Sequence, residues 1–178
     1  MNSSAKRILV VDNEESALAS MRDLLRQQDY AVATAQNAVQ ASDILRQQQF
    51  AVVLADQQTH VLTGVEFLAG VKKVQPDASR VLMASALSLS TVIEAINTVE
   101  IYRVIHKPWH REDLLLAVRS AVERYEAIIQ SKLLLKTTQA MNETLAKLNQ
   151  SLERQLAEAR TERGLEKRDG DTKRDART

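Results

Sequence analysis

Five short apolar runs alternate with amphipathic stretches along the chain, and this alternation constrains the fold more than any other feature. The runs are short, rich in β-branched or small residues and not strictly alternating, as expected of strands buried on both faces. They are Ile8–Val11, Ala31–Ala35, Ala51–Ala55, Arg80–Ala84 and Tyr102–His106. The segments between them carry apolar residues at helical spacing, as Leu18, Met21 and Leu25 do. This pattern predicts an α/β fold, a parallel sheet with helices on both faces.

Charged residues stand where three of the predicted strands end. The first run is followed by Asp12 and Asn13, the third by Asp56, and the fifth by Lys107. In an open parallel sheet the ligand site lies at the carboxyl ends of the strands, so a flavodoxin-like strand order would gather these residues at one edge. Each residue alone is ordinary turn, cap or surface chemistry. Together, two acids suit a hard cation such as Mg²⁺, and a carboxylate beside a metal and a lysine is a plausible nucleophile toward a phosphoryl group.

Three stretches, ILVVDNEES, VVLADQQTHVLTGVEFL and YRVIHKPW, resemble the CheY-like receiver domain of bacterial two-component response regulators. The resemblance covers about residues 5–125. It implies a flavodoxin-like (βα)₅ doubly wound parallel sheet and a phosphoryl group passed from a sensor histidine kinase to Asp56, with Lys107 contacting the phosphoryl oxygens. It also implies Mg²⁺ as cofactor. The residues expected to bind this metal are Asp12, Asn13, Asp56 and, through its backbone carbonyl, Gln58.

The chain departs from the family pattern at three positions. Asn13 stands where the family has a second acid, and the lost negative charge is expected to weaken Mg²⁺ binding. Ala84 replaces the usual Ser or Thr, and Val104 replaces the usual aromatic residue. These departures leave two interpretations open. The first is a phosphorylation-responsive regulator, and the second is a degenerate pseudo-receiver that serves as a phosphorylation-independent dimeric adaptor or scaffold.

A second region begins after the resemblance ends. Between Arg111 and Arg163 there is neither Gly nor Pro, and helix formers dominate. Apolar residues recur there at alternating spacings of four and three, which favours a coiled coil and therefore a homodimer through this helix. A helix that folds back on the receiver or frays is the alternative. The residues in question are Leu114, Val118, Ala121, Tyr125 and Ile128, and then Met141, Leu145, Leu148 and Leu152.

The expected organisation is a receiver domain at 1–125, a helical coiled-coil extension at 126–163 and a disordered charged tail at 164–178. The tail is expected to be disordered because it is charged and almost devoid of apolar residues. No catalytic output domain fits in the remaining length, so we expect a signalling protein rather than an enzyme. Its output would be dimerisation and contacts with an unknown downstream protein.

Composition excludes several other classes of function. The net charge is +1, and there is neither a helix-turn-helix pattern nor a concentrated basic region, so direct nucleic-acid binding is not expected. The chain has no Cys, which excludes disulfides and thiol chemistry. No apolar segment reaches the length of a signal peptide core or a membrane span. We therefore expect a cytoplasmic protein that does not insert into membranes.

Overall fold

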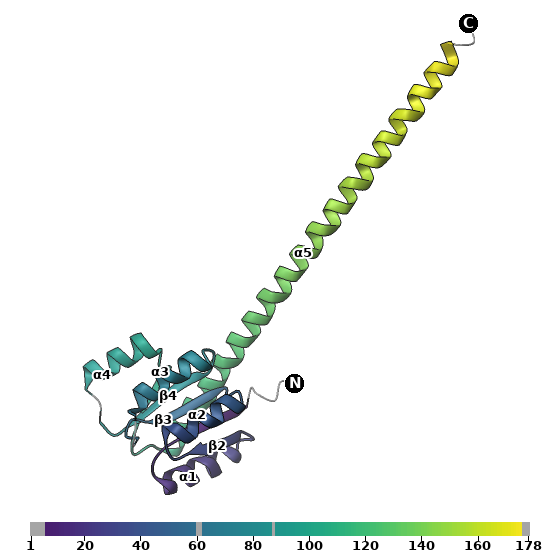
Figure 1. Cartoon of the computed structure of the whole chain (residues 1–178). Helices are drawn as coiled ribbons and strands as arrows, with labels where there is room; N and C mark the ends of the chain where they lie inside the picture. Colours follow the sequence, from purple (N-terminus) through teal and green to yellow (C-terminus); the bar gives the residue numbers. More distant parts are fainter. Residues whose placement is uncertain (1–5, 60–61, 87, 176–178) are drawn as a thin grey trace. The chain divides into compact units, whose positions relative to one another are not determined.

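The computed structural model describes residues 6–59, 62–86 and 88–175, with side chains as far as residue 161. Five strands form one sheet in the order β2-β1-β3-β4-β5, and every adjacent pair is parallel (Figure 1). The predicted α/β fold with flavodoxin-like strand order is therefore confirmed. The strands are β1 (Arg7–Val11), β2 (Ala31–Ala35), β3 (Val52–Asp56), β4 (Ser79–Ala84) and β5 (Arg103–His106).

The segments that connect the strands are helical, as their apolar spacing predicts. The segment that contains Val92, Ile93 and Ile96 forms a short α-helix and a following π-helical turn, called η1. The helices are α1 (Glu15–Arg26), α2 (Ala38–Gln47), α3 (Gly64–Val74), α4 (Leu89–Glu94), η1 (Ala95–Val99) and α5 (Arg111–Asp175).

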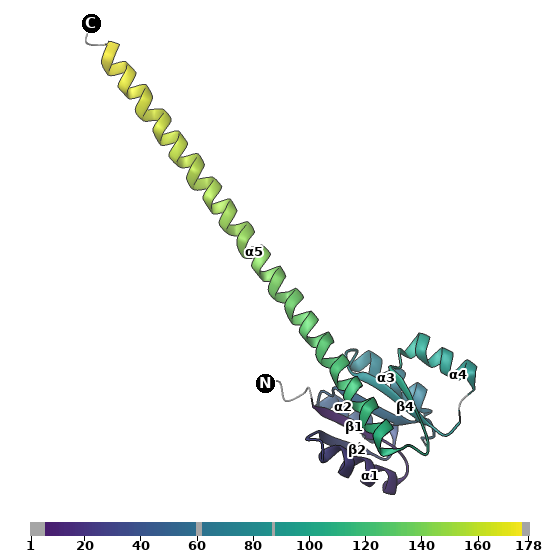
Figure 2. The ribbon, with the colours of Figure 1, turned by 180° about the vertical axis from the view of Figure 1, so that it is seen from behind.

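Helices on both faces of the sheet create two hydrophobic cores. On one face, α1 and the first turns of α5 cover side chains such as Ile8 and Leu54, and Figure 2 shows these two helices together on that face. On the other face, α2, α3 and η1 cover side chains such as Leu9 and Leu82. Neighbouring residues of one strand thus enter different cores, which explains why the strands are apolar without alternation.

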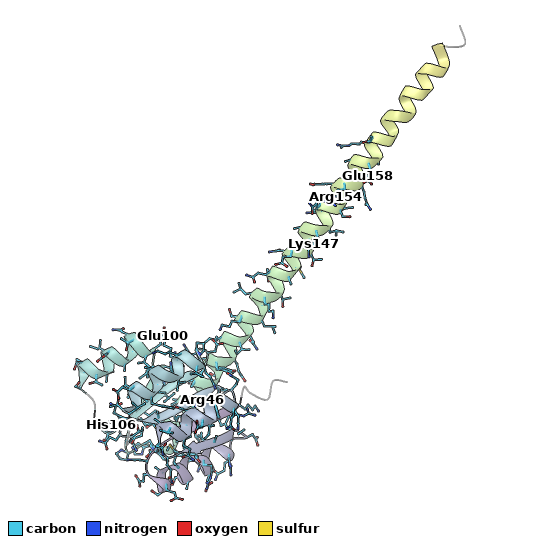
Figure 3. The ribbon with its side chains drawn as sticks, in the orientation of Figure 1. Arg46, Glu100, His106, Lys147, Arg154 and Glu158 are labelled. Carbon is cyan, nitrogen blue, oxygen red and sulfur yellow. The ribbon has the colours of Figure 1, made fainter. Side chains whose placement is uncertain are left out.

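A buried arginine fixes the connection that leads into β5. Arg80 of β4 is fully buried, and its guanidinium donates to the carbonyl oxygens of Ala78 at 2.9 Å and Val99 at 2.9 Å. It also reaches the carboxylate of Glu100 at 3.4 Å. Glu100, labelled in Figure 3, has a positive φ of 55°. Its carboxylate lies 2.9 Å from the ammonium of Lys72 on α3. These bonds supply acceptors to a charge that would otherwise be costly to bury.

The helix α5 belongs to two structural units. The chain divides into a unit of residues 1–130 and a unit of residues 131–178, and α5 has residues in both. The first part of the apolar stripe is already covered, because its residues are buried in the core that α5 shares with α1 and the sheet. These residues are Leu114, Val118, Ala121 and Tyr125. In the second unit the corresponding side chains are exposed. These are Met141 at 62%, Leu145 at 51%, Leu148 at 55% and Leu152 at 48%.

The structure continues α5 to Asp175, which differs from the disordered tail expected at 164–178. Extending an existing helix avoids the cost of nucleation, and the Lys, Arg and Glu residues of this segment are good helix formers. Residues 176–178 lie outside the described residues. Within the described ranges, no helix combines the length and the apolar character needed to cross a bilayer.

Candidate functional site

Carboxylates from two neighbouring strands meet one lysine at the carboxyl edge of the sheet. The Lys107 ammonium lies 2.9 Å from Asp12 Oδ2 and 3.3 Å from Asp56 Oδ2. Asp12 is fully buried and Asp56 is 5% exposed, whereas the lysine side chain is 21% exposed. The structure therefore brings together the two acids and the lysine that the strand ends predict, although they are distant in sequence.

The sheet itself sets the position of each of these groups. Asp12 follows β1, where its N–H donates to the carbonyl of Ala35 at 3.2 Å and its Oδ1 accepts from the N–H of Glu14 at 3.0 Å. The Lys107 N–H donates to the carbonyl of Ala84 at 2.8 Å, which continues the β4–β5 ladder by one residue. The backbone of the two acids and the lysine belongs to the sheet or directly extends it. The backbone positions from which these side chains project are therefore fixed.

Burial and charge perturb the ionisation of two of these groups. Burial raises the pKa of Asp56, Lys107 opposes this rise, and the nearby charge of Asp12 adds to it. Burial of the Lys107 ammonium works to lower its pKa, but the hydrogen bond and charge of Asp12, together with Asp56, outweigh burial and raise it. Lys107 therefore stays protonated and partly offsets two crowded carboxylates.

The oxygen donors at this edge fit a magnesium ion. Two carboxylates that contact the same ammonium group also lie close enough to face a shared cation, and Mg²⁺ prefers oxygen ligands while keeping several waters. Among the described residues, no cluster of three or more His, Cys, Asp or Glu has metal-binding geometry. This agrees with Asn13, a neutral amide, standing beside Asp12. The predicted ligand set would be two carboxylates plus neutral oxygens.

The two remaining predicted ligands lie at the surface of the same edge. Asn13 is exposed directly after Asp12. Gln58 is exposed two residues after Asp56 and forms an isolated antiparallel bridge with Thr63. Their side chains are thus not part of the buried acidic pair, and their roles as metal ligands stay predictions.

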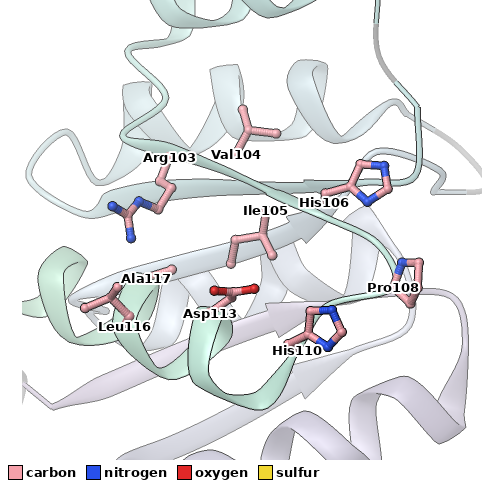
Figure 4. Close-up of a pocket in the computed structure, with 9 residues that line it drawn as sticks. All are labelled: Arg103, Val104, Ile105, His106, Pro108, His110, Asp113, Leu116 and Ala117. Atoms are coloured by element: carbon pink, nitrogen blue, oxygen red, sulfur yellow. The ribbon is translucent and has the colours of Figure 1, made fainter.

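Two of the three departures from the family pattern, Ala84 and Val104, have different surroundings. Ala84 ends β4 and is 3% exposed. Val104 packs against the core under α3 and η1, and Figure 4 shows it on the opposite side of β5 from Ile105. Neither side chain can form a hydrogen bond.

A pocket of about 470 Å³ lies beside β5 and the start of α5 (Figure 4). Its polar lining includes His106, His110 and Asp113, and it contains neither Asp12 nor Asp56. It is therefore separate from the acidic pair.

Gln57 and Gly64 contribute to the site although neither was predicted as a site residue. Gln57 follows Asp56 and binds the amino-terminal end of α3, where Gly64 is in close contact with the Asp56 backbone. The sequence contains one weak signal for this contact, a glycine at the end of the loop that follows Asp56. The signal is weak because glycine also marks ordinary turns. No sequence pattern predicts that the Gln57 side chain binds α3.

Comparison with known proteins agrees with this geometry. The family model of the response regulator receiver domain matches residues 8–119. The hydrogenase transcriptional regulatory protein HoxA of Cupriavidus necator is 34% identical over 123 residues, which are 69% of this chain and 25% of that protein. HoxA of Bradyrhizobium diazoefficiens is 32% identical over 118 residues, or 66% of this chain and 24% of that protein. The chain thus spans about a quarter of the length of these curated relatives.

Solved structures show the same fold. The signal receiver domain of an HD domain-containing protein from Pseudomonas fluorescens Pf-5 is 32% identical with a TM-score of 0.65, covering 68% of this chain and 97% of that one. The beryllofluoride-activated NtrC4 receiver domain dimer is 31% identical with a TM-score of 0.64, covering 67% and 98%. With the family model matching more than half of its residues, this chain belongs to the response regulator receiver domain family, a signalling module of two-component systems.

Proposed function

We propose that Asp56 accepts a phosphoryl group from a phosphorylated histidine of a sensor kinase. The observation that carries this proposal is the single lysine in contact with the buried carboxylates of Asp12 and Asp56. A surface aspartate needs no such partner, and a purely structural role does not require two buried carboxylates to share one cation. Here two acids share one edge that is open enough to leave the lysine a fifth exposed.

The chemical step is a phosphoryl transfer between two nucleophiles. A carboxylate oxygen of Asp56 forms a bond to phosphorus as the phosphorus–nitrogen bond of the phosphohistidine breaks. The leaving imidazole keeps the electron pair of that bond and takes up a proton, and the product is an acyl phosphate. The nucleophile must be ionised, so the cation beside it matters because burial raises the pKa of Asp56.

Each neighbouring group has a defined task in this proposal. Lys107 stabilises the charge that develops on the phosphoryl oxygens, because a fixed cation in a poorly solvated site stabilises such charge strongly. Asp12, Asn13, Asp56 and the carbonyl of Gln58 would bind Mg²⁺. When bound, that metal supplies further electrostatic stabilisation of the transferring phosphoryl group. Asn13 contributes no charge, so we propose that the metal is held more weakly than by two adjacent acids.

Intact-mass measurement tests the transfer. Purified protein with Mg²⁺ and a small phosphodonor is expected to gain the mass of one phosphoryl group, and Asp56→Ala is expected to gain none. Asp43→Asn is a matched control, because Asp43 is an exposed carboxylate on α2 that pairs with the exposed Arg46. Wild type that remains unmodified with an active donor would reject the proposal.

We further propose that the segment 126–163 acts as a dimerising extension of a receiver at 1–125. Its support is the exposed stripe of Met141, Leu145, Leu148 and Leu152, which a second parallel helix would cover. Charged side chains such as Lys147 and Glu158 are also exposed along this helix (Figure 3). Phosphorylation would then alter how paired receivers contact each other or a downstream protein.

One observation favours a second candidate function. The Ala84 methyl group ends β4 where the family has a hydroxyl that contacts the phosphoryl group, and the aromatic partner is replaced by Val104. A chain without these two groups could serve as a phosphorylation-independent dimeric adaptor. The same intact-mass experiment separates the candidates, because an adaptor of this kind remains dimeric and unmodified when the donor is present.

A further inference from the structure

The amino-terminal end of α3 is in close contact with the backbone of the acceptor residue. A Cβ atom at position 64 would lie 2.9 Å from the carbonyl carbon of Asp56 and 2.8 Å from Leu82 Cδ1, and closer still to the Asp56 carbonyl oxygen. Real side chains do not tolerate such separations from backbone, so only glycine permits this approach. The amino-terminal end of α3 therefore lies directly against the Asp56 backbone.

Gln57, the residue immediately after the acceptor, binds this helix end twice. Its backbone carbonyl accepts from the N–H of Gly64 at 3.0 Å, and its side-chain Oε1 accepts from the N–H of Val65 at 3.3 Å. The next N–H, that of Glu66, donates to Thr63 Oγ1 at 3.2 Å. The first N–H groups of a helix lack partners within the helix. Gln57 supplies acceptors for two of these three donors.

The same residue is also tied to the sheet. The Gln57 N–H donates to the carbonyl of Met83 at 2.8 Å, which extends the pairing of β3 with β4 beyond Asp56. Gln57 is thus bound through its N–H, its backbone carbonyl and its side chain, to β4 on one side and α3 on the other. Asp56 precedes it directly, and Gln58 follows.

We infer that Gln57 is a positioning residue for phosphoryl transfer, acting through the peptide that links Asp56 to Gln58. Its side chain holds α3 against that peptide. This contact fixes the backbone position of Asp56, which carries the carboxylate, and the orientation of the Gln58 carbonyl. The inference rests on the proposed function of Asp56. Because small displacements of reacting groups carry large kinetic penalties, loss of the side-chain bond is expected to slow transfer about tenfold.

Two substitutions separate the hydrogen bond from the bulk of the side chain. Gln57→Met keeps the length and the apolar stem but removes the acceptor. Gln57→Glu keeps an acceptor oxygen and adds a charge that the amino-terminal end of a helix favours. Gln40→Met is the matched control, because Gln40 Oε1 accepts from the N–H of Gln36 at 2.8 Å beside α2. It removes a similar bond at a helix other than the one that Gln57 binds.

The rate of Asp56 phosphorylation by a small phosphodonor is measured at limiting and saturating Mg²⁺. Gln57→Met is expected to react about tenfold more slowly to the same final stoichiometry, with Gln57→Glu and Gln40→Met within about twofold of wild type. A wild-type rate in Gln57→Met would overturn the inference. So would a Gln57→Glu variant as slow as Gln57→Met, because the acceptor oxygen would then not be what matters.

A second readout does not depend on transfer. The backbone amide resonances of Asp56 and Gln58 are expected to shift in Gln57→Met and to return toward wild type in Gln57→Glu. Resonances that are unchanged in Gln57→Met would overturn the inference whether or not the protein is phosphorylated. If wild type takes up no phosphoryl group while these resonances respond as expected, the proposed function fails and the positioning of the Asp56 backbone by Gln57 stands.

Discussion

Replacing Lys107 with Met should expose how strongly the fold depends on the charge balance at the acidic edge. The substitution keeps most of the aliphatic stem and removes the ammonium that lies 2.9 Å from Asp12 and 3.3 Å from Asp56. At an effective dielectric constant of about 20, each contact corresponds to roughly 5 kcal/mol before desolvation is subtracted. Removing one partner from a buried ion pair costs about 3–5 kcal/mol. Because the lysine is 21% exposed, we expect the lower end, about 3 kcal/mol.

The pH dependence gives this prediction its sign. Burial already raises the pKa of Asp56, and without Lys107 the pKa should rise further above its unfolded value. A carboxyl group whose pKa is raised on folding stabilises the folded state while it is protonated. This stabilisation is lost as pH rises through the folded pKa, because the ionised group is unfavourable in the folded protein. The deficit of Lys107→Met relative to wild type should therefore be large near neutral pH. It should shrink as pH falls below the raised pKa.

Urea unfolding followed by the fluorescence of Trp109, which packs against the core beneath α1 and α5, measures this effect at fixed protein concentration. Adding Asp56→Asn to Lys107→Met should restore much of the lost stability. Lys72→Met is the control, because Lys72 pairs with the more exposed Glu100 and should cost less than about 1 kcal/mol. An equal deficit at neutral and acidic pH, or strict additivity of the two site substitutions, would refute the reasoning.

Three further predictions concern the metal, the buried arginine and the helix. Asn13→Asp should tighten Mg²⁺ binding about tenfold in a calorimetric titration by adding a charge beside Asp12; unchanged affinity would exclude this position from the metal site. Arg80→Met should lower the free energy of unfolding by about 3 kcal/mol or more, since several carbonyls and a carboxylate lose their donor. A loss below about 1 kcal/mol would contradict the view that Arg80 holds the connection into β5 in place. Changing Leu145 and Leu148 to Glu should give a monomer with an intact receiver in light scattering; wild type that is itself monomeric at micromolar concentration would reject the coiled coil.

The arrangement of the sheet could be predicted from the sequence because burial on both faces leaves a direct signature. Runs such as Ile8–Val11 and Ala51–Ala55 have no room for polar residues, so the first charge marks the end of the strand. Once the strands are parallel, their ends share one edge, and the flavodoxin-like strand order brings Asp12, Asp56 and Lys107 together there. The spatial arrangement of the site residues could therefore be predicted from the apolar runs that mark the strands.

Two other features could not be predicted, for different reasons. Arg80 belongs to an apolar run but is charged, and its acceptors include the backbone carbonyls of Ala78, just before β4, and of Val99, in η1, which no residue pattern specifies. Leu114 and Leu145 share the same spacing within one helix, yet the first is buried in the receiver core and the second is exposed. Spacing identifies an apolar stripe but not what covers it.

The central claim is that the acidic edge is a working phosphoryl acceptor, and phosphorylation of Asp56 tests it most directly. Wild type, Asp56→Ala and Lys107→Met are treated with Mg²⁺ and a small phosphodonor, and each is followed by intact mass and by peptide mapping at mild pH. The account predicts one phosphoryl group per wild-type chain, located on Asp56, none on Asp56→Ala and a much slower gain in Lys107→Met. A wild type that stays unmodified, or a phosphoryl group found on a different residue, would contradict it.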